Sequence, residues 1–440
     1  MKKGKVFSLG IQHVLAMYAG AIIVPLIVGG ALKLSPEQLS YLVAIDLLTC
    51  GLATLLQVWN NRFFGVGLPV VLGCTFTAVG PMIAIGGQYG MGAIYGAIIA
   101  AGLFVVLFAG AFGKILKLFP PIVTGSVVTI IGITLIPVAI KDMAGGAGSQ
   151  NFGSPQNLLL SFGVLGFILL LYRFSKGFIR AVSILIGLIG GTIVAAAIGL
   201  VDFAPVMEAS WVHMPKPFYF GVPTFEISAI ITMILVAIVS LIESTGVFMA
   251  LGKICDRDLT PKDLTKGYRG EGLAIILGGI FNAFPYTTYS QNVGLVQLSG
   301  VKTKQVIYVA GGMLVFLGFI PKVAALTTLI PTPVMGGAMV AMFGMVFASG
   351  IKMLSEVNLA KQENLLIIAC SVGMGLGVTV EPELFSKLPA SVQILTENGI
   401  VSGSLMAIVL NLLFNARTKK ITVPQIQKSS RETVNSQQTV

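Results

Sequence analysis

Apolar runs of about 20 residues recur along the whole chain, and this repetition constrains the fold more than any other feature. A helix of about 20 apolar residues is long enough to cross the ~30 Å hydrocarbon core of a bilayer. Only 10% of the residues are charged, whereas a soluble domain carries about a quarter. The sequence therefore predicts an all-α integral membrane protein that crosses the bilayer many times.

Fourteen apolar segments can be placed on the sequence. They lie near residues 7–29, 38–59, 66–86, 92–112, 119–140, 157–173, 178–201, 226–252, 271–283, 285–299, 303–320, 327–350, 363–380 and 396–415. With the N-terminus in the cytoplasm, most Lys and Arg residues fall in cytoplasmic loops, as the positive-inside rule requires. We therefore expect a transmembrane domain over 1–415 and a cytoplasmic polar tail over 416–440. The net charge of +11 therefore reflects basic residues in cytoplasmic loops, and no nucleic-acid partner is expected.

Two pairs of segments match between the halves of the chain. Segments 66–86 and 285–299 are both interrupted by Gly or Pro, and such matched breaks mark the binding sites of transporters. A second pair begins with similar Pro-containing sequences, FPPIVTG at 119–125 and IPTPVMG at 330–336. Both pairs are seven segments apart, an odd number, so we expect two inverted repeats, over about 7–201 and 226–415. Two unrelated helices that begin with Pro are the alternative.

Three carboxylates fall within or at the ends of predicted spans, and a carboxylate at membrane depth suggests a functional site. Glu243 lies mid-span with no Lys or Arg near it, so we expect it to exchange a proton and to accept a ligand N–H. A packing residue bonded to a neighbouring helix is the alternative. Glu271 begins its segment, where the helix dipole or Arg269 could stabilise it instead. Asp46 lies away from any Gly or Pro break, which favours helix–helix hydrogen bonding.

The start of segment 285–299 places seven polar side chains in the ten residues 285–294. Exposed to lipid, such a run would be prohibitive, but in a cavity it offers hydroxyls, amides and backbone N–H groups to a ligand. Segment 66–86 supplies a counterpart, GCTFT at 73–77, and segment 7–29 opens with Gln12 and His13. A His at a helix start is more often structural than a ligand. The Cys and His residues have no metal-ligand spacing, so no metal or cofactor is expected.

On these motifs the sequence resembles the nucleobase–ascorbate transporter family, the xanthine/uracil permeases, and most of all its bacterial xanthine permeases. The family signature is Gln/Glu-Asn-x-Gly, then four residues, then Thr. Here it reads QNVG at 291–294 and ends in Ser299, so Ser replaces the usual Thr. The Gln12–His13 pair and the sequence ESTG at 243–246 also match motifs of the family. The resemblance covers essentially all of the chain before the polar tail.

The resemblance implies fourteen spans in two inverted repeats of seven. Spans 1–4 and 8–11 would form a core domain, and spans 5–7 and 12–14 a gate domain. Spans 3 and 10 would each be part strand and part helix, with the ligand between them. The resemblance also implies a homodimer.

The resemblance further implies the roles of individual residues. Glu243 would bind the base, Gln291 would grip its edge, and Phe76 would stack on its face. The residues expected to bind substrate are Glu243, Gln291, Phe76, Thr75, Ser290, Tyr289 and Gly20. Those expected to serve proton coupling or structural support are Glu243, Glu271, Asn292, His13 and Gln12. Many relatives carry His or Asp one turn after the glutamate of span 8; here that position is Val247, which leaves more weight on Glu243 and Glu271.

These observations predict a secondary active transporter in the bacterial inner membrane, with both termini in the cytoplasm. It would import an oxidised purine, xanthine in the first place, together with protons by alternating access. Urate or another nucleobase is the alternative substrate. Three other classes stay open: an anion transporter on the same scaffold, against which the buried carboxylates argue; a membrane enzyme, for which no nucleophile–base set is seen; and a passive channel.

Overall fold

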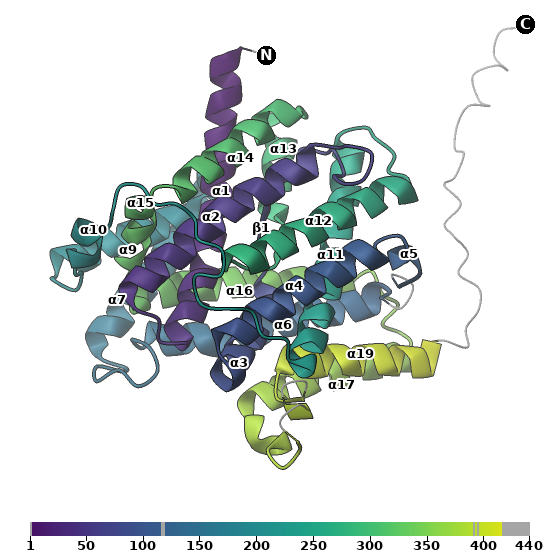
Figure 1. Cartoon of the computed structure of the whole chain (residues 1–440). Coiled ribbons are helices and arrows are strands. Elements are labelled where there is room, and N and C mark those ends of the chain that lie inside the picture. Colours follow the sequence, from purple (N-terminus) through teal and green to yellow (C-terminus); the bar gives the residue numbers. More distant parts are fainter. Residues whose placement is uncertain (1, 116–118, 390–391, 394–395, 416–440) are drawn as a thin grey trace, which may run out of the picture.

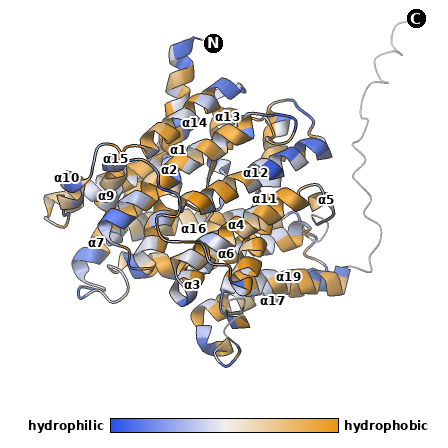
Figure 2. Cartoon of the chain, viewed as in Figure 1, coloured by the Kyte–Doolittle hydropathy of each residue, from blue (hydrophilic) through white to orange (hydrophobic). Residues whose placement is uncertain are grey.

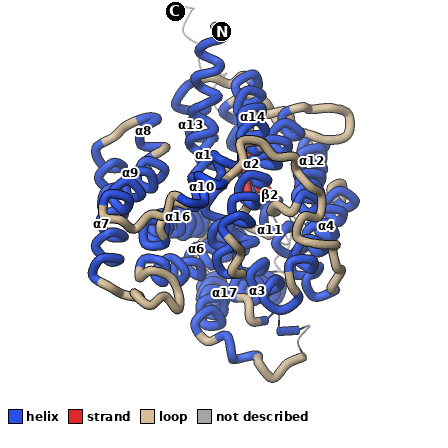
Figure 3. The backbone as a smooth tube through the Cα atoms, turned by 60° about the vertical axis from the view of Figure 1, so that its left-hand side comes forward, coloured by secondary structure: helices blue, strands red, loops and turns tan. Residues whose placement is uncertain are grey.

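The chain forms helices that enclose one short two-stranded sheet near the centre (Figures 1 and 3). The computed structural model describes residues 2–115, 119–389, 392–393 and 396–415. The polar tail expected at 416–440 lies outside the described residues. Hydrophobic residues cover most of the helices, and hydrophilic ones gather at helix ends and in loops (Figure 2).

The helices of the first half are α1 (Lys3–Ala31), α2 (Pro36–Val58), the 3-10 turn η1 (Phe76–Ala78), α3 (Val79–Tyr89), α4 (Met91–Phe108), α5 (Phe112–Ile115), α6 (Pro121–Met143), α7 (Pro155–Phe174), α8 (Gly177–Ala181), α9 (Ser183–Ala197) and α10 (Ala204–Glu208). Those of the second half are α11 (Ile227–Ile254), α12 (Pro261–Phe281), α13 (Ser290–Ser299), α14 (Lys304–Gly318), α15 (Pro321–Thr328), α16 (Thr332–Leu354), α17 (Gln362–Val380), the 3-10 turn η3 (Pro382–Phe385) and α19 (Gly399–Asn415).

Each of the fourteen predicted segments is largely helical in the structure; segment 178–201 contains two consecutive helices, α8 and α9, and the two broken segments contain a strand followed by a helix. By length and composition, eight helices in the described part of the chain could cross a membrane. The number rises to nine if α14 and α15, which are bent by 81° at their junction, count as one span. The protein is therefore a multi-pass membrane protein with several shorter or broken elements among its long helices.

Hydrogen-bonding side chains fix the starts of several helices. Ser35 caps α2 and Thr260 caps α12, each in a reciprocal capping box, with a proline in the first turn. Burial alone would raise the pKa of Asp263, but hydrogen bonds from Thr260 and the charge of Arg257 hold it below its usual value. In α12 the cap starts the helix ten residues before the predicted apolar segment at 271–283.

The predictions that Glu271 and His13 lie at helix starts are wrong. Helix α12 begins at Pro261 and α1 at Lys3, so both residues lie well inside a helix and are buried. The apolar stretch begins later than the helix because the capping box on α12 and the first turns of both helices are polar. Among the described residues, the ion pairs are Arg257–Asp263 and Lys302–Asp256, so Arg269 does not pair with Glu271.

The prediction that the two broken segments are part strand is confirmed. Strand β1 (Leu72–Cys74) pairs antiparallel with β2 (Tyr286–Thr288), with Gly73 opposite Thr287. Helix α2 fixes β1, because Thr54 Oγ1 accepts the Leu72 N–H at 3.0 Å. Turn η1 follows β1 after one residue, and α13 follows β2 after one residue. The N-termini of η1 and α13 thus lie beside the same small sheet.

The helices pack mainly in two sets. Helices α1, α2, α4, α11, α12 and α14 pack on one another and on the strands, whereas α6, α7, α9, α16, α17 and α19 pack mostly among themselves. Helices α6 and α16, whose starts match in sequence, cross closely at glycines. A Cβ atom at Gly132 would overlap the backbone of Phe347, and one at Gly350 would overlap that of Thr129.

Candidate functional site

A cavity of about 590 Å³ lies beside the strands, between α11 of the first set of helices and α6 and α16 of the second. Its lining includes six of the seven residues predicted to bind substrate: Thr75, Phe76, Glu243, Tyr289, Ser290 and Gln291. A larger cavity of about 810 Å³ elsewhere is lined by Tyr41, Glu208 and His213, and contains no residue predicted for the site. We therefore take the 590 Å³ cavity as the candidate substrate site.

Gly20 is the predicted substrate-binding residue that does not line this cavity. It is buried on α1, where an added Cβ would lie 3.0 Å from the ring of Tyr289. Gly73 of β1 leaves room for the same ring, since its Cβ would lie 2.5 Å from Tyr289 Cζ. Both glycines therefore make space for Tyr289, and the resemblance could not distinguish that role from ligand contact.

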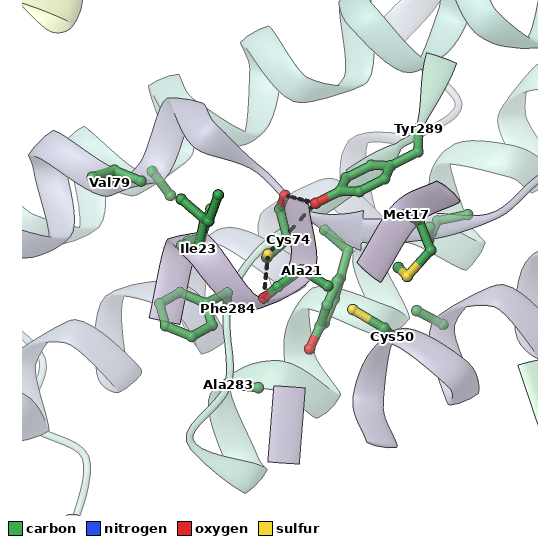
Figure 4. Close-up of a cluster of buried hydrophobic side chains, with 14 of the residues drawn as sticks. Met17, Ala21, Ile23, Cys50, Cys74, Val79, Ala283, Phe284 and Tyr289 are labelled. Atoms are coloured by element: carbon green, nitrogen blue, oxygen red, sulfur yellow. Dashed lines mark hydrogen bonds between the residues drawn. The ribbon is translucent and has the colours of Figure 1, made fainter. Parts of the chain in front are cut away.

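Tyr289, in the second broken segment, is held by hydrogen bonds to the first. Its hydroxyl donates to the carbonyl oxygen of Cys74 at 3.0 Å and lies 3.7 Å from Cys74 Sγ (Figure 4). Its backbone N–H donates to the Val71 carbonyl at 3.0 Å. Thr75 is held similarly, with its N–H on the Pro285 carbonyl. These bonds fix the ends of both strands, and the residues that directly follow the strands line the cavity.

Glu243 and Glu271 occupy different positions relative to the cavity. Glu243 lines it from α11, whereas Glu271 on α12 is fully buried behind it. Ser244, the residue after Glu243, donates its hydroxyl to Glu271 Oε1 at 2.7 Å. The residue next to Glu243 in sequence thus contacts Glu271, a relation that the separation of the two glutamates by 28 positions did not reveal.

His13 and Asn292 form a buried contact between α1 and α13. Asn292 Nδ2 donates to His13 Nδ1 and to the His13 carbonyl oxygen, each at 3.0 Å. His13, Asn292 and Gln12 do not line the cavity. This geometry fits the structural support that was expected of His13 and Asn292, which hold the half-helix that carries Gln291.

Asp46 bonds to the sheet, although the sequence favoured a bond between helices. Tyr286 of β2 donates its hydroxyl to Asp46 Oδ1 at 3.2 Å, and Cys50 Sγ lies 3.5 Å from Oδ2. Tyr286 also contacts Thr49. Among the described residues no group of three His, Cys, Asp or Glu side chains could hold a metal ion.

Helix α16 contributes a cavity wall that the sequence reasoning missed. Its lining residues are Met342, Met345, Val346, Ser349, Lys352 and Met353, with Glu356 just beyond the helix. They recur at three- and four-residue spacing, which is one face of a helix. Phe343 packs edge-on against Phe76, with ring centroids 5.7 Å apart. The spacing was visible in the sequence, but a methionine-rich face is more often core than cavity.

A cavity that combines apolar walls with a few polar side chains, at the junction of two broken membrane segments and between long apolar helices, is the architecture of a solute transporter. The chain matches the family model described as "Permease family" over residues 4–384. It therefore belongs to the xanthine/uracil permease family, as its motifs predicted, and it is a transporter and not an enzyme.

Several relatives are similar over nearly their whole length. A nucleobase transporter of Paenibacillus larvae subsp. larvae is 69% identical over 96% of this chain and 97% of its own. A xanthine permease of Bacillus subtilis is 64% identical over 95% of this chain and 96% of its own. A uric acid permease of the same organism, PucK, is also 64% identical, over 94% of this chain and 96% of its own.

The fold is shared with more distant transporters. The transmembrane domain of the cyanobacterial bicarbonate transporter BicA superposes with a TM-score of 0.64 at 16% identity, covering 89% of this chain and 97% of that domain. SLC26A9 superposes with a TM-score of 0.57 at 12% identity, covering 92% of this chain and 65% of that protein. At such low identity the likeness concerns the fold alone.

Proposed function

We propose that the protein imports an oxidised purine, xanthine in the first place, together with protons by alternating access. The observation that carries this proposal is that Glu243, Gln291 and Phe76 line one cavity. A carboxylate accepts ring N–H groups, and an amide both donates and accepts, so the pair can read the edge of a purine. Phe76 offers an aromatic face on which a planar base can stack.

The half-helices add recognition of the purine's carbonyl oxygens. Ser290 and Gln291 belong to the first turn of α13, and Phe76 begins η1, in which the Thr77 N–H already donates to Thr75 Oγ1. Backbone N–H groups in first turns have no partner within their helix, and they favour electron-rich oxygen atoms. An oxidised purine carries such oxygens, so it can bind these N–H groups, whereas an apolar solute cannot.

We infer fourteen spans arranged as two inverted repeats, over about 7–201 and 226–415. The matched broken segments carry the antiparallel strands, and the matched helices α6 and α16 pack side by side, as repeats related by an in-plane axis would. The set of helices around the strands corresponds to the proposed core domain of spans 1–4 and 8–11. The other set corresponds to the gate domain of spans 5–7 and 12–14.

The cavity leads toward the proposed cytoplasmic side. Ser349, Lys352 and Glu356 extend its lining to the C-terminal end of α16 and just beyond, which the charge pattern assigns to the cytoplasm. The conformation is therefore inward-facing in this account. Rocking of the core domain against the gate domain would close this side and open the other. We place the protein in the bacterial inner membrane with both termini inside, as a homodimer.

An anion transporter on the same scaffold is disfavoured by the cavity itself. A carboxylate such as Glu243 in the lining repels a small inorganic anion such as sulfate, which has no N–H group to donate, whereas it accepts hydrogen bonds from the ring N–H groups of a purine. The likeness to BicA and SLC26A9 does not alter this reasoning, because it concerns the fold.

Competition for uptake tests the proposed substrate. Xanthine and urate permeases are equally similar to this chain, at 64% identity. We expect unlabelled xanthine to displace labelled xanthine in cells that produce the protein. Urate should compete next best, and uracil poorly, because Gln291 supplies an amide rather than a carboxylate to the base. Inhibition by sulfate and not by purines would contradict the proposal.

A further inference from the structure

Ser244 connects the buried carboxyl group of Glu271 to strand β2. Its hydroxyl donates to Glu271 Oε1 at 2.7 Å and accepts the backbone N–H of Thr288 at 3.2 Å. All three residues are buried. The other carboxyl oxygen of Glu271, Oε2, is buried without a hydrogen-bond partner in the described part of the chain. Among the described residues, Ser244 therefore supplies the hydrogen bond to this carboxyl group.

The same serine hydroxyl also reaches a residue of the substrate cavity. Ser244 Oγ lies 3.3 Å from Thr287 Oγ1, and either hydroxyl can be the donor. Thr287 lines the cavity together with Glu243. A serine hydroxyl has one hydrogen and two acceptor positions, so Ser244 can donate to Glu271 or to Thr287, but not to both.

We propose that Ser244 is a positioning residue that transmits the protonation state of Glu271 to Thr287 and so to the substrate. This inference rests on the proposed function. When Glu271 is ionised, Ser244 donates to the carboxylate and accepts hydrogen bonds from Thr288 N–H and Thr287 O–H. When Glu271 carries a proton on Oε1, the acid donates to Ser244, which turns its own hydrogen toward Thr287 Oγ1.

Both arrangements satisfy all three hydrogen-bonding positions of Ser244, so the hydroxyl can reverse without losing any of its own hydrogen bonds. Thr287 changes from donor to acceptor, which frees its hydrogen for the Ser240 carbonyl at 3.4 Å or for a substrate in the cavity. The only O–H bond that forms is that of Glu271, with the proton it takes up. The titratable groups that act on Glu271 are Glu243 on α11 and Tyr268 on α12.

Equilibrium binding of labelled xanthine to membranes, measured from acidic to neutral pH, tests this role. We expect the affinity of the unmodified protein to change with pH, and Ser244→Ala to remove the part that depends on Glu271. The profile of Ser244→Ala should then match that of Glu271→Gln, and the double variant should show no further change. Accumulation by Ser244→Ala should fall by roughly tenfold or more, the usual effect of losing a charge-assisted hydrogen bond.

Thr245→Val is the matched control. Thr245 follows Ser244 on α11 and pairs with Tyr268 of α12 at 2.8 Å, so the variant removes a similar bond between the same helices without contact to Glu271 or β2. Its pH profile should stay that of the unmodified protein. If Ser244→Ala is poorly produced, Ser244→Cys keeps the size and a weak donor, and should give an intermediate profile.

A pH profile of Ser244→Ala or Ser244→Cys that runs parallel to that of the unmodified protein would overturn the inference, since a merely structural serine lowers affinity equally at every pH. Failure of the unmodified protein to transport xanthine would instead reject the proposed function. The two failures are thus distinguished by the unmodified protein alone.

Discussion

Replacement of Glu243 by Gln should abolish proton-driven accumulation of xanthine and leave measurable xanthine binding. Glu243 lies in the middle of α11 and lines the cavity, so its carboxyl group can reach both the proton pathway and the base. The amide resembles the protonated acid in shape, so the protein should still fold and insert. The amide cannot ionise, but its oxygen can still accept a purine N–H, without the gain that a charge gives.

The comparison requires accumulation and equilibrium binding at matched protein levels. Glu363→Gln is the control, because it makes the same change at an exposed residue in the first turn of α17, away from the cavity. It should accumulate xanthine normally. Normal pH-driven accumulation by Glu243→Gln would show that the coupling proton travels elsewhere, and Glu271 and Asp46 would be the next carboxyl groups to replace.

Replacement of Gln291 by Glu should weaken xanthine binding about 5- to 150-fold. The carboxylate lacks the amide N–H donor, so one acceptor of the bound purine loses its partner, which costs roughly 1–3 kcal/mol. Gln291 lies in the first turn of α13 and lines the cavity. Competition of xanthine and uracil against labelled xanthine measures the change.

Gln297→Glu is the control for this variant, because Gln297 lies on the same helix, is exposed and does not line the cavity. Its xanthine affinity should match that of the unmodified protein. An unchanged affinity in Gln291→Glu would remove this residue from the substrate site, and the edge of the purine would have to be read by other groups.

The elements of the fold were predictable because hydrophobicity and helix breakers are local properties of the sequence. The apolar segments became helices or strand–helix units, and the Gly and Pro breaks marked the two strands. Helix starts were less predictable. Glu271 and His13 lie inside helices because polar turns precede the apolar stretches of α12 and α1.

The contents of the cavity were predictable only where a residue was conspicuous at membrane depth or matched a family motif. Glu243 and Gln291 met those conditions. Ser244 lies in the ESTG motif and Thr287 in the polar run at 285–294, but neither pattern showed that their two hydroxyl oxygens lie 3.3 Å apart. The α16 face was missed for a similar reason: methionines at helical spacing pack a core as readily as they line a cavity.

Uptake by the purified protein in proteoliposomes tests the central claim most directly. Labelled xanthine should accumulate above its external concentration when the outside is made acidic, and the accumulated xanthine should leave when a protonophore collapses the gradient. Glu243→Gln proteoliposomes should not accumulate xanthine under the same gradient. Equilibration of xanthine to equal concentrations, with or without the pH gradient, would contradict proton-coupled import and indicate a passive pathway.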